Sequence, residues 1–354
     1  MTLTVLSVAY PLAPVSRDAV GGAEQVLATL DAALVAKGHR SLVIAAEGSQ
    51  VAGTLLAVPV ETGTLDEAAK SRAHARHRAA IDDAMQRFPI DVVHLHGVDF
   101  ADYLPDRGPT LVTLHLPLDW YPSEVLRPAR ADLWLHPVSE SQAATAPSGA
   151  ILQPSIRNGV DTEAFAAPDG HRCLALLLSR ICPEKGIHLA IDAAKAADLP
   201  LLIGGQVYPY EAHQRYFETE VQPRFDRRRR FLGPLAFARK RRLLHMARCL
   251  VIPSLAPETS SLVAMEALAC GTPVVAFPNG ALADVVEDGV TGFLVNSVAE
   301  MAEAMRQVDQ LDPENCRRAA RERFSLDHMV AGYFDAYDQL AALGRTGHPG
   351  RIAS

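Results

Sequence analysis

The 354-residue sequence lacks the features of several protein classes. It has no uninterrupted run of about 20 apolar residues, so no transmembrane helix is predicted. Its five cysteines are odd in number and scattered without a CxxC pair, which argues against a disulfide framework or a structural zinc site and indicates a reducing compartment. It also lacks an excess of positive charge, because the formal net charge is -7, and nucleic-acid binding is therefore not expected.

The N-terminus lacks the basic flank and the cleavage site of a signal peptide. We therefore interpret the apolar segment 5–9 as a buried first strand and expect a cytoplasmic protein. The composition fits an ordinary α/β protein, with 49% hydrophobic and 21% charged residues. The length suits two domains of about 150 residues each.

Short apolar runs alternate with amphipathic stretches in both halves of the chain, which predicts strand–helix–strand units and parallel sheets. In the first half, a helix that ends at Lys37-Gly38 follows the first strand, and strands are expected at 5–9, 41–45, 92–95, 110–114 and 133–136. In the second half, strands are expected at 173–178, 201–203, 249–252 and 273–277. Helices are expected there at 187–194, 239–247 and 262–269, and in the tail at 326–343.

The segment 144–169 is rich in proline and glycine and has weak periodicity, so it is the expected linker. The expected domains are 1–155 and 156–325, with a C-terminal helix in 326–354 that packs back on the first domain. In such sheets ligands bind beyond the carboxyl ends of the strands. The loops that follow strands are therefore the places to look for a site.

Two glutamates lie eight residues apart: Glu258 follows a predicted strand, and Glu266 lies inside the next predicted helix. Both point to one side if Glu258 lies at the helix entrance. A glutamate among the apolar residues of this helix needs a buried partner or a ligand, and carboxylates suit sugar and ribose hydroxyls. The alternative is structural, with one acid serving the helix dipole and the other solvated.

Arg180 and Lys185 flank a turn between a predicted strand and a helix start that contains Pro183. Two cations and free helix amides together form an anion site. Arginine can bind two phosphate oxygens through its fork, and lysine adds a point charge. Many α/β loops contain both residue types, so the pair alone is a weak indication of phosphate binding.

Gly21 and Gly22 open the first predicted helix, where glycine allows the backbone to approach a phosphate closely. The alternative is a plain flexible loop. The fingerprint G-x-G-x-x-G is absent from this turn, which argues against a nicotinamide dehydrogenase.

Histidines end two neighbouring predicted strands. His94 and His96 lie two residues apart and so share one face of a strand. No third ligand is evident nearby, and we interpret both as structural and predict no metal site. His115 ends the next strand, where it is either a satisfied core histidine or a site residue.

These motifs resemble those of glycosyltransferase family 4, whose members have the two-domain GT-B fold. The resemblance covers nearly the whole chain and is densest over 177–295. It rests on the glutamate pair with the following Ala-Leu-Ala-Cys-Gly, on the Arg-x4-Lys-Gly element, and on the first-helix glycines: Glu258, Glu266, Arg180, Lys185, Gly186, Gly21 and Gly22. It implies two Rossmann-like, doubly wound parallel-sheet domains that face a central cleft, with the donor in the C-terminal domain and the acceptor in the N-terminal one.

The resemblance implies a retaining glycosyltransferase that moves a hexose or an N-acetylhexosamine from a nucleotide diphosphate sugar, with UDP favoured, to an acceptor hydroxyl. No metal or other cofactor is expected. A hinge near 154–160 is expected to close the cleft. The implied catalytic residues are His115, Glu258, Arg180 and Lys185. The implied donor-binding residues are Gly21, Gly22, Arg180, Lys185, Glu258, Thr259, Ser260, Ser261, Leu262 and Glu266.

Within this set, Glu258 would face the donor sugar's hydroxyls, Glu266 the ribose, and the two cations the diphosphate. Family members usually have an aromatic residue and a glycine soon after the first glutamate, and here Ser260 and Ser261 stand instead. This departure puts the choice of sugar in doubt. The alternatives are a sugar-nucleotide epimerase of the same fold and a non-catalytic protein that binds a sugar nucleotide.

Two features have no place in the donor site. The loop 116–124 is the expected acceptor surface, through Asp119, Trp120 and Tyr121. The segments Arg227 to Arg230 and Arg239 to Arg242 hold eight basic residues, which we interpret as a solvated face. Weak contact with an anionic membrane surface is the alternative for this basic cluster.

Overall fold

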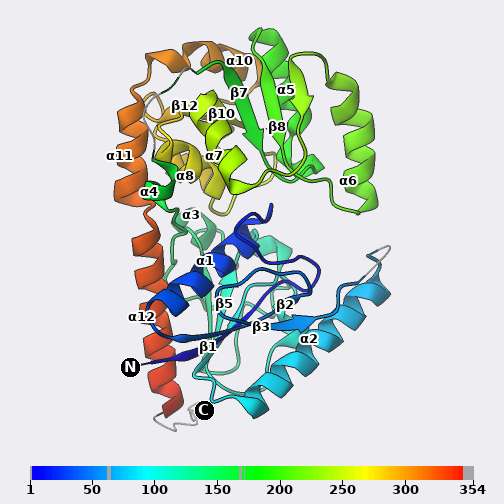
Figure 1. Cartoon of the computed structure of the whole chain (residues 1–354), viewed down its shortest axis with the longest axis vertical. Coiled ribbons are helices and arrows are strands. Elements are labelled where there is room, and N and C mark those ends of the chain that lie inside the picture. Colours follow the sequence, from blue (N-terminus) through cyan, green and yellow to red (C-terminus); the bar gives the residue numbers. More distant parts are fainter. Residues whose placement is uncertain (1, 62–64, 167–169, 171, 346–354) are drawn as a thin grey trace. The chain divides into compact units, whose positions relative to one another are not determined.

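A computed structural model of the chain describes residues 2–61, 65–166, 170 and 172–345 (Figure 1). They form two compact units: unit 1 from the described residues of 1–157 and 329–354, and unit 2 from 158–328. The chain passes into unit 2 after Arg157 and returns to unit 1 after His328, inside helix α12 (Leu326–Arg345).

Unit 1 is built on a six-stranded parallel sheet with the order β3-β2-β1-β4-β5-β6. This is the Rossmann order, in which the direction of winding reverses between β1 and β4. The strands are β1 (Thr4–Val8), β2 (Arg40–Ala46), β3 (Thr54–Val58), β4 (Val92–Leu95), β5 (Thr110–Leu114) and β6 (Leu133–Pro137). The helices are α1 (Gly22–Ala36), α2 (Glu67–Arg87) and α3 (Glu140–Ala143), with short turns η1 (Phe100–Tyr103) and η2 (Leu118–Trp120).

The central strands of unit 1 are continuous apolar runs because both faces of the sheet are covered. Every residue of β4 and β5 is buried. Helix α12 packs on this sheet: the Tyr337 hydroxyl lies 2.8 Å from Nδ1 of His94, and the Tyr333 hydroxyl lies 3.2 Å from that of Thr113. The C-terminal helix therefore belongs to the core of unit 1.

Unit 2 holds a second six-stranded parallel sheet with the order β12-β11-β10-β7-β8-β9, which is the same winding read from the other edge. Its direction reverses between β7 and β10. The strands are β7 (Leu174–Leu178), β8 (Leu201–Gly204), β9 (Arg229–Phe231), β10 (Ala247–Ile252), β11 (Val274–Ala276) and β12 (Gly292–Leu294). The main helices are α5 (Ile187–Ala196), α6 (Glu211–Tyr216), α7 (Phe237–Met246), α8 (Leu262–Ala269), α10 (Val298–Gln307) and α11 (Pro313–Arg323). Shorter elements are α4 (Thr162–Phe165), α9 (Leu282–Val285), η3 (Pro183–Lys185), η4 (Phe217–Val221), η5 (Gln222–Arg224) and η6 (Val308–Gln310).

The two sheets confirm the predicted architecture of two doubly wound parallel α/β sheets. None of the described helices combines the length and apolar character that spanning a bilayer requires. The chain crosses between the units beside a short parallel bridge of unit 2, in which the Val160 amide donates to the Phe324 carbonyl at 2.9 Å and the Leu326 amide donates to the Val160 carbonyl at 2.9 Å.

Candidate active site

Three of the predicted donor residues of unit 2 lie on the two loops that leave the reversal point of its sheet. The loop after β7 carries Arg180 and Lys185, and the loop after β10 carries Glu258. The loops are bonded together, since the Leu255 amide donates to the Glu184 carbonyl at 2.7 Å. Both predicted motifs therefore meet where the topology of such a sheet places a ligand.

Gly186 sets the close approach of these loops. It ends η3 with φ 61°, a left-handed conformation that glycine adopts without a steric penalty. A Cβ atom here would overlap the carbonyl oxygen of Pro253, which is backbone and cannot swing away. The Lys-Gly part of the motif thus has a structural reason as well as a chemical one.

Lys185 and Glu258 form an ion pair at the centre of this arrangement. The Lys185 ammonium donates to Oε1 of Glu258 at 2.6 Å, and the Ser254 hydroxyl also donates to Oε1. The backbone of Glu258 is held by the Ala281 amide, which donates to its carbonyl at 2.7 Å. Burial opposes ionisation of this carboxyl, but the charges and hydrogen bonds of its neighbours hold the pKa of Glu258 below its usual value. Glu258 is therefore a carboxylate at neutral pH.

Arg180 stands on the same loop and is half-buried. Its positive charge helps to lower the pKa of Glu258. Its guanidinium makes no hydrogen bond or ion pair within the described part of the chain. Arg180 can thus turn its donors to an incoming anion without breaking a contact.

Helix α8 adds backbone donors to these cations. It begins at Leu262, and the Ala264 and Met265 amides donate to the Ser261 carbonyl at 3.1 and 3.3 Å, which leaves the amides of Leu262 and Val263 without a partner within the helix. Ser261, the residue before it, has φ 63°, a conformation that is uncommon for a residue other than glycine. The Ser260 hydroxyl is buried and has no hydrogen-bond partner among residues 2–61, 65–166, 170 and 172–345. Strain and an unpaired polar atom thus coincide at the entrance of this helix.

We expect Ser261→Gly to raise the free energy of unfolding by about 0.5–1 kcal/mol, because glycine relieves the left-handed strain at this position. The measurement is urea unfolding followed by circular dichroism. Ser297→Gly is the matched control, since Ser297 caps α10 with extended backbone and its hydroxyl accepts from the Glu300 amide. Lower stability of Ser261→Gly would contradict the assignment of strain to this residue.

Glu266 is buried within α8 and pairs with Lys240 of α7. The Lys240 ammonium donates to Oε1 of Glu266 at 2.5 Å, and both side chains are almost fully covered. The second oxygen, Oε2, is buried without a hydrogen-bond partner among the described residues. Burial raises the pKa of Glu266, and the Lys240 charge counters this rise. The alternative of a solvated glutamate is therefore wrong, and one oxygen of Glu266 has unused capacity for a hydroxyl donor.

The predicted glycines of unit 1 lie at the start of α1. Gly21 precedes the helix with extended backbone, and Gly22 is its first residue. A Cβ atom on Gly21 would overlap the carboxylate of Glu24, which is buried in the first turn. Glu24 thus lies at the positive end of the helix, where a carboxylate is favourable.

Four histidines of unit 1 form one network at the carboxyl ends of β4, β5 and β6: His94, His96, His115 and His136. The rings of His94 and His96 lie 3.9 Å apart, which agrees with the predicted common face. Nδ1 of His96 lies 3.0 Å from Nε2 of His115. The Thr113 hydroxyl hydrogen-bonds to two of these rings: it lies 2.8 Å from Nε2 of His94 and 2.7 Å from Nε2 of His136. His115 is thus connected to the core network and is half-buried at its end.

Burial lowers the pKa of His115 to about 3 and of His136 to about 4, and holds the pKa of His94 and His96 well below the usual range. An unfolded histidine takes up a proton near pH 6.5. As pH falls from about 6.5 toward 4, the unfolded chain therefore binds more protons than unit 1, and unit 1 loses stability.

We expect each of these buried histidines to add a slope approaching about 1.4 kcal/mol per pH unit below pH 6. Urea unfolding followed by tryptophan fluorescence reports unit 1 alone, because both tryptophans, Trp120 and Trp134, lie in it. The midpoint should fall steeply between pH 7 and 5. His328→Ala, at an exposed histidine, is the control and should keep this dependence. A flat midpoint over this range would contradict a neutral histidine network.

The predicted acceptor segment divides into exposed and buried residues. Asp119 and Trp120 are exposed, the latter at 43%. Tyr121 is 5% exposed, and the Leu116 amide donates to its hydroxyl at 3.3 Å. Tyr121 therefore supports the loop from inside, which leaves Asp119 and Trp120 as the surface of this segment.

The basic cluster is not the uniformly solvated face that the sequence predicts. Arg229 lies in the short strand β9 and is buried, and Arg228 pairs with Asp198. Lys240 pairs with Glu266, and Arg241 donates to the Ala164 carbonyl at 3.1 Å. At least four of the eight cations thus serve unit 2 itself, which weakens the membrane-surface alternative.

Several residues that contact the predicted site residues were not predicted from the sequence. Lys240 was hidden within the basic cluster, although its spacing to Leu243 and Leu244 places it on the buried face of α7. Ser254 is the second residue after the predicted strand 249–252, and it was visible as a loop residue without a predicted role. Asn279, whose side-chain amide donates to the Ser254 carbonyl at 2.6 Å, has no local signal at all.

Family models match both halves of the chain. The model described as Glycosyltransferase Family 4 matches residues 20–164, and the model described as Glycosyl transferases group 1 matches residues 172–310. Among curated relatives, the D-inositol 3-phosphate glycosyltransferase of Salinispora tropica is 30% identical over 227 aligned positions, and the match covers 54% of this chain and 47% of the relative. The matched region spans about half or less of the length of the first curated relatives.

Solved structures match over nearly the whole chain. Sucrose-phosphate synthase from Thermosynechococcus elongatus has a TM-score of 0.78 at 19% identity, and the superposition covers 96% of this chain and 100% of the synthase chain. Anabaena HepE in complex with UDP and glucose has a TM-score of 0.70 at 20% identity, with 95% and 99% covered. These likenesses establish the GT-B fold.

Proposed function

We infer that this chain acts as a glycosyltransferase, because it belongs to the glycosyltransferases that join a Family 4 domain to a group 1 domain. We propose that it is a retaining glycosyltransferase that moves a hexose or an N-acetylhexosamine from a nucleotide diphosphate sugar to an acceptor hydroxyl. The observation that carries this proposal is the Lys185–Glu258 pair of 2.6 Å beside Arg180, at the reversal point of the unit 2 sheet.

The two cations suit the diphosphate leaving group. When the bond from the anomeric carbon to the phosphate oxygen breaks, its electron pair stays on the diphosphate, and the added negative charge needs donors already in place. Arg180, Lys185 and the Leu262 and Val263 amides at the start of α8 are proposed to supply them. We propose that this set takes over the role that a divalent metal has in other transferases, so that the transfer of the sugar needs no metal.

The two glutamates suit hydroxyl groups. Glu258 keeps acceptor lone pairs beyond those used by Lys185 and Ser254, and it is proposed to orient the donor sugar. The unpartnered Oε2 of Glu266 is proposed to accept a hydrogen bond from the ribose of the nucleotide. A hydroxyl at this position would satisfy a buried oxygen that otherwise raises the free energy of the folded state.

In the proposed retaining step the acceptor oxygen bonds to the anomeric carbon on the face that the diphosphate leaves. The proton of the acceptor hydroxyl passes to a phosphate oxygen, so no protein base is needed. His115, neutral at pH 7, is proposed to hydrogen-bond the transferred sugar. UDP is the favoured nucleotide, and the structure of HepE in complex with UDP and glucose supports this choice through the shared fold.

The proposal is tested by incubating the full chain with a UDP-sugar and candidate hydroxyl acceptors, and by measuring UDP release and the anomeric form of the product. We expect acceptor-dependent release, a product with the donor's anomeric configuration, and turnover that EDTA leaves unchanged. Production of an epimer without acceptor would favour the epimerase alternative. Binding of the donor with no turnover would favour the non-catalytic alternative, and strong inhibition by EDTA would reject the metal-free mechanism.

A further inference from the structure

Cys182, Glu184 and His213 form a cluster of metal-ligand side chains in unit 2. The ligand atoms, one sulfur, one carboxylate oxygen and one ring nitrogen, all lie within 4.8 Å of one another. It is the one such group of three in the described ranges. Sulfur, imidazole nitrogen and carboxylate oxygen are the ligand types of zinc. Three protein ligands leave a fourth position for water.

Two of the ligands are positioned by the loop after β7. Cys182 precedes η3 with extended backbone, and Pro183 opens that turn. The Glu184 carbonyl accepts the Leu255 amide at 2.7 Å, which fixes the backbone between the two side chains. Cys182 is buried, at 1% exposed, so its thiol faces the protein interior and not bulk water.

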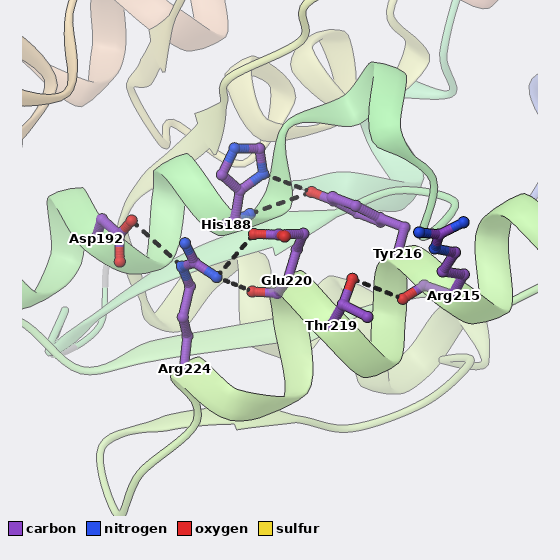
Figure 2. Close-up of polar contacts among 7 residues, drawn as sticks. All are labelled: His188, Asp192, Arg215, Tyr216, Thr219, Glu220 and Arg224. Atoms are coloured by element: carbon purple, nitrogen blue, oxygen red, sulfur yellow. Dashed lines mark hydrogen bonds and ion pairs between the residues drawn. The ribbon is translucent and has the colours of Figure 1, made fainter.

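The third ligand comes from α6, which is anchored to α5 independently of the cluster. The Tyr216 hydroxyl lies 2.8 Å from Nδ1 of His188 and accepts from the His188 amide at 3.3 Å (Figure 2). Downstream, Arg224 bonds to Glu220 and to Asp192 of α5, as Figure 2 also shows. The position of α6 therefore does not depend on a bond between His213 and the loop.

His213 carries the observation that points to a missing ligand. Its Nδ1 is shielded from solvent and has no hydrogen-bond partner in the described part of the chain. Its ring packs edge-on against Tyr210, with 5.1 Å between the ring centroids. An unpaired buried nitrogen raises the free energy of the folded state, so the His213 ring has ligand capacity that none of the described residues uses.

We propose that Cys182, Glu184 and His213 bind a divalent zinc ion. On binding, the Cys182 thiol loses its proton to the buffer and its sulfur forms the metal bond. The thiolate and the carboxylate then carry two negative charges, which neutralise the ion next to Arg180. The ion would connect α6 to the loop after β7. None of the three ligands belongs to the Lys185–Glu258 pair, so the ion takes no part in the transfer step. The zinc proposal therefore does not rest on the proposed function.

The chemistry of the cluster makes binding dependent on pH. Burial raises the pKa of the Cys182 thiol to about 11, and each ion must displace this proton. Zinc affinity should therefore rise by up to about tenfold per pH unit between pH 6 and 8, before buffer and hydroxide compete.

The test titrates the metal-free full chain, prepared with EDTA and desalted, with Co²⁺ and with Zn²⁺ in the absence of nucleotide. We expect one Co²⁺ per chain with the strong absorption of a cobalt–thiolate bond, its displacement by Zn²⁺, and a higher unfolding temperature with Zn²⁺. Cys182→Ser and His213→Ala should each weaken metal binding by more than about 100-fold, beyond the loss that follows when only a supporting residue is removed.

Cys173→Ser and His328→Ala are matched controls, because both remove an exposed residue of the same type from unit 2. They should keep the thiolate band and the affinity. Circular dichroism of each variant in EDTA checks the fold separately from metal binding. The proposal is overturned if the cobalt spectrum has no thiolate band or if Cys182→Ser or His213→Ala keeps the wild-type affinity. It is also overturned if no metal binds at ~0.1 mM, a concentration far above that at which structural zinc sites fill.

Discussion

Lys185→Ala is expected to lower kcat by more than about 100-fold, on the scale of losing one preorganised donor that stabilises developing charge. In the structure Lys185 is paired with Glu258, and the charge of Arg180 acts on the same carboxylate. Removing the ammonium takes a cation from the leaving group and also leaves the Glu258 carboxylate without its nearest counter-charge. The measurement is initial rate against donor concentration, which separates kcat from KM.

Two further variants make this result specific. Lys195→Ala removes an exposed lysine from α5 of the same unit and should leave kcat unchanged. Lys185→Arg keeps the charge but changes its geometry, so it should recover part of the loss. Near-normal turnover of a folded Lys185→Ala protein would remove Lys185 from the mechanism.

Lys240→Met is expected to lower the free energy of unfolding by about 3–5 kcal/mol, because it leaves a buried carboxylate without its partner. The Lys240–Glu266 pair of 2.5 Å is almost fully covered by α7 and α8. The loss should shrink as pH falls, since a protonated Glu266 no longer needs a cation. Unfolding in urea followed by circular dichroism at pH 7.5 and 5 measures both effects.

The double variant Lys240→Met/Glu266→Gln separates the pair from simple packing. It removes both charges and should regain much of the stability lost in Lys240→Met. Lys240→Arg keeps a cation and should lie between the wild type and Lys240→Met. A Lys240→Met protein as stable as the wild type would show that the buried pair is not formed.

The parallel sheets could be predicted from the sequence because their central strands are short apolar runs that are buried on both faces. The predicted strand at 110–114 is β5, and the predicted helix at 262–269 is α8. The long helix α2 escaped prediction because many charged residues break its apolar stripe. Strand β9 escaped for another reason: it has three residues and begins with two arginines, so no local pattern separates it from a polar loop.

The site could be predicted in part. The meeting of Arg180, Lys185 and Glu258 could be predicted, because residues after neighbouring parallel strands come together at one edge of a sheet. The pairing of Glu266 with Lys240 could not be read, since the two residues lie 26 positions apart on different helices. The left-handed backbone of Ser261 was also hidden, because serine gives no local signal for it. Features that depend on the order of strands and loops could thus be predicted from the sequence. Features that depend on tertiary packing could not.

Calorimetry with UDP-, GDP-, ADP- and TDP-sugars measures whether unit 2 binds a nucleotide diphosphate sugar. We expect that one nucleotide, UDP by preference, binds selectively, that EDTA leaves its affinity unchanged, and that Lys185→Ala weakens it. If no member of the panel binds at about 1 mM, which corresponds to only about 4 kcal/mol of binding free energy, the loops after β7 and β10 are not a donor site and the transferase proposal fails.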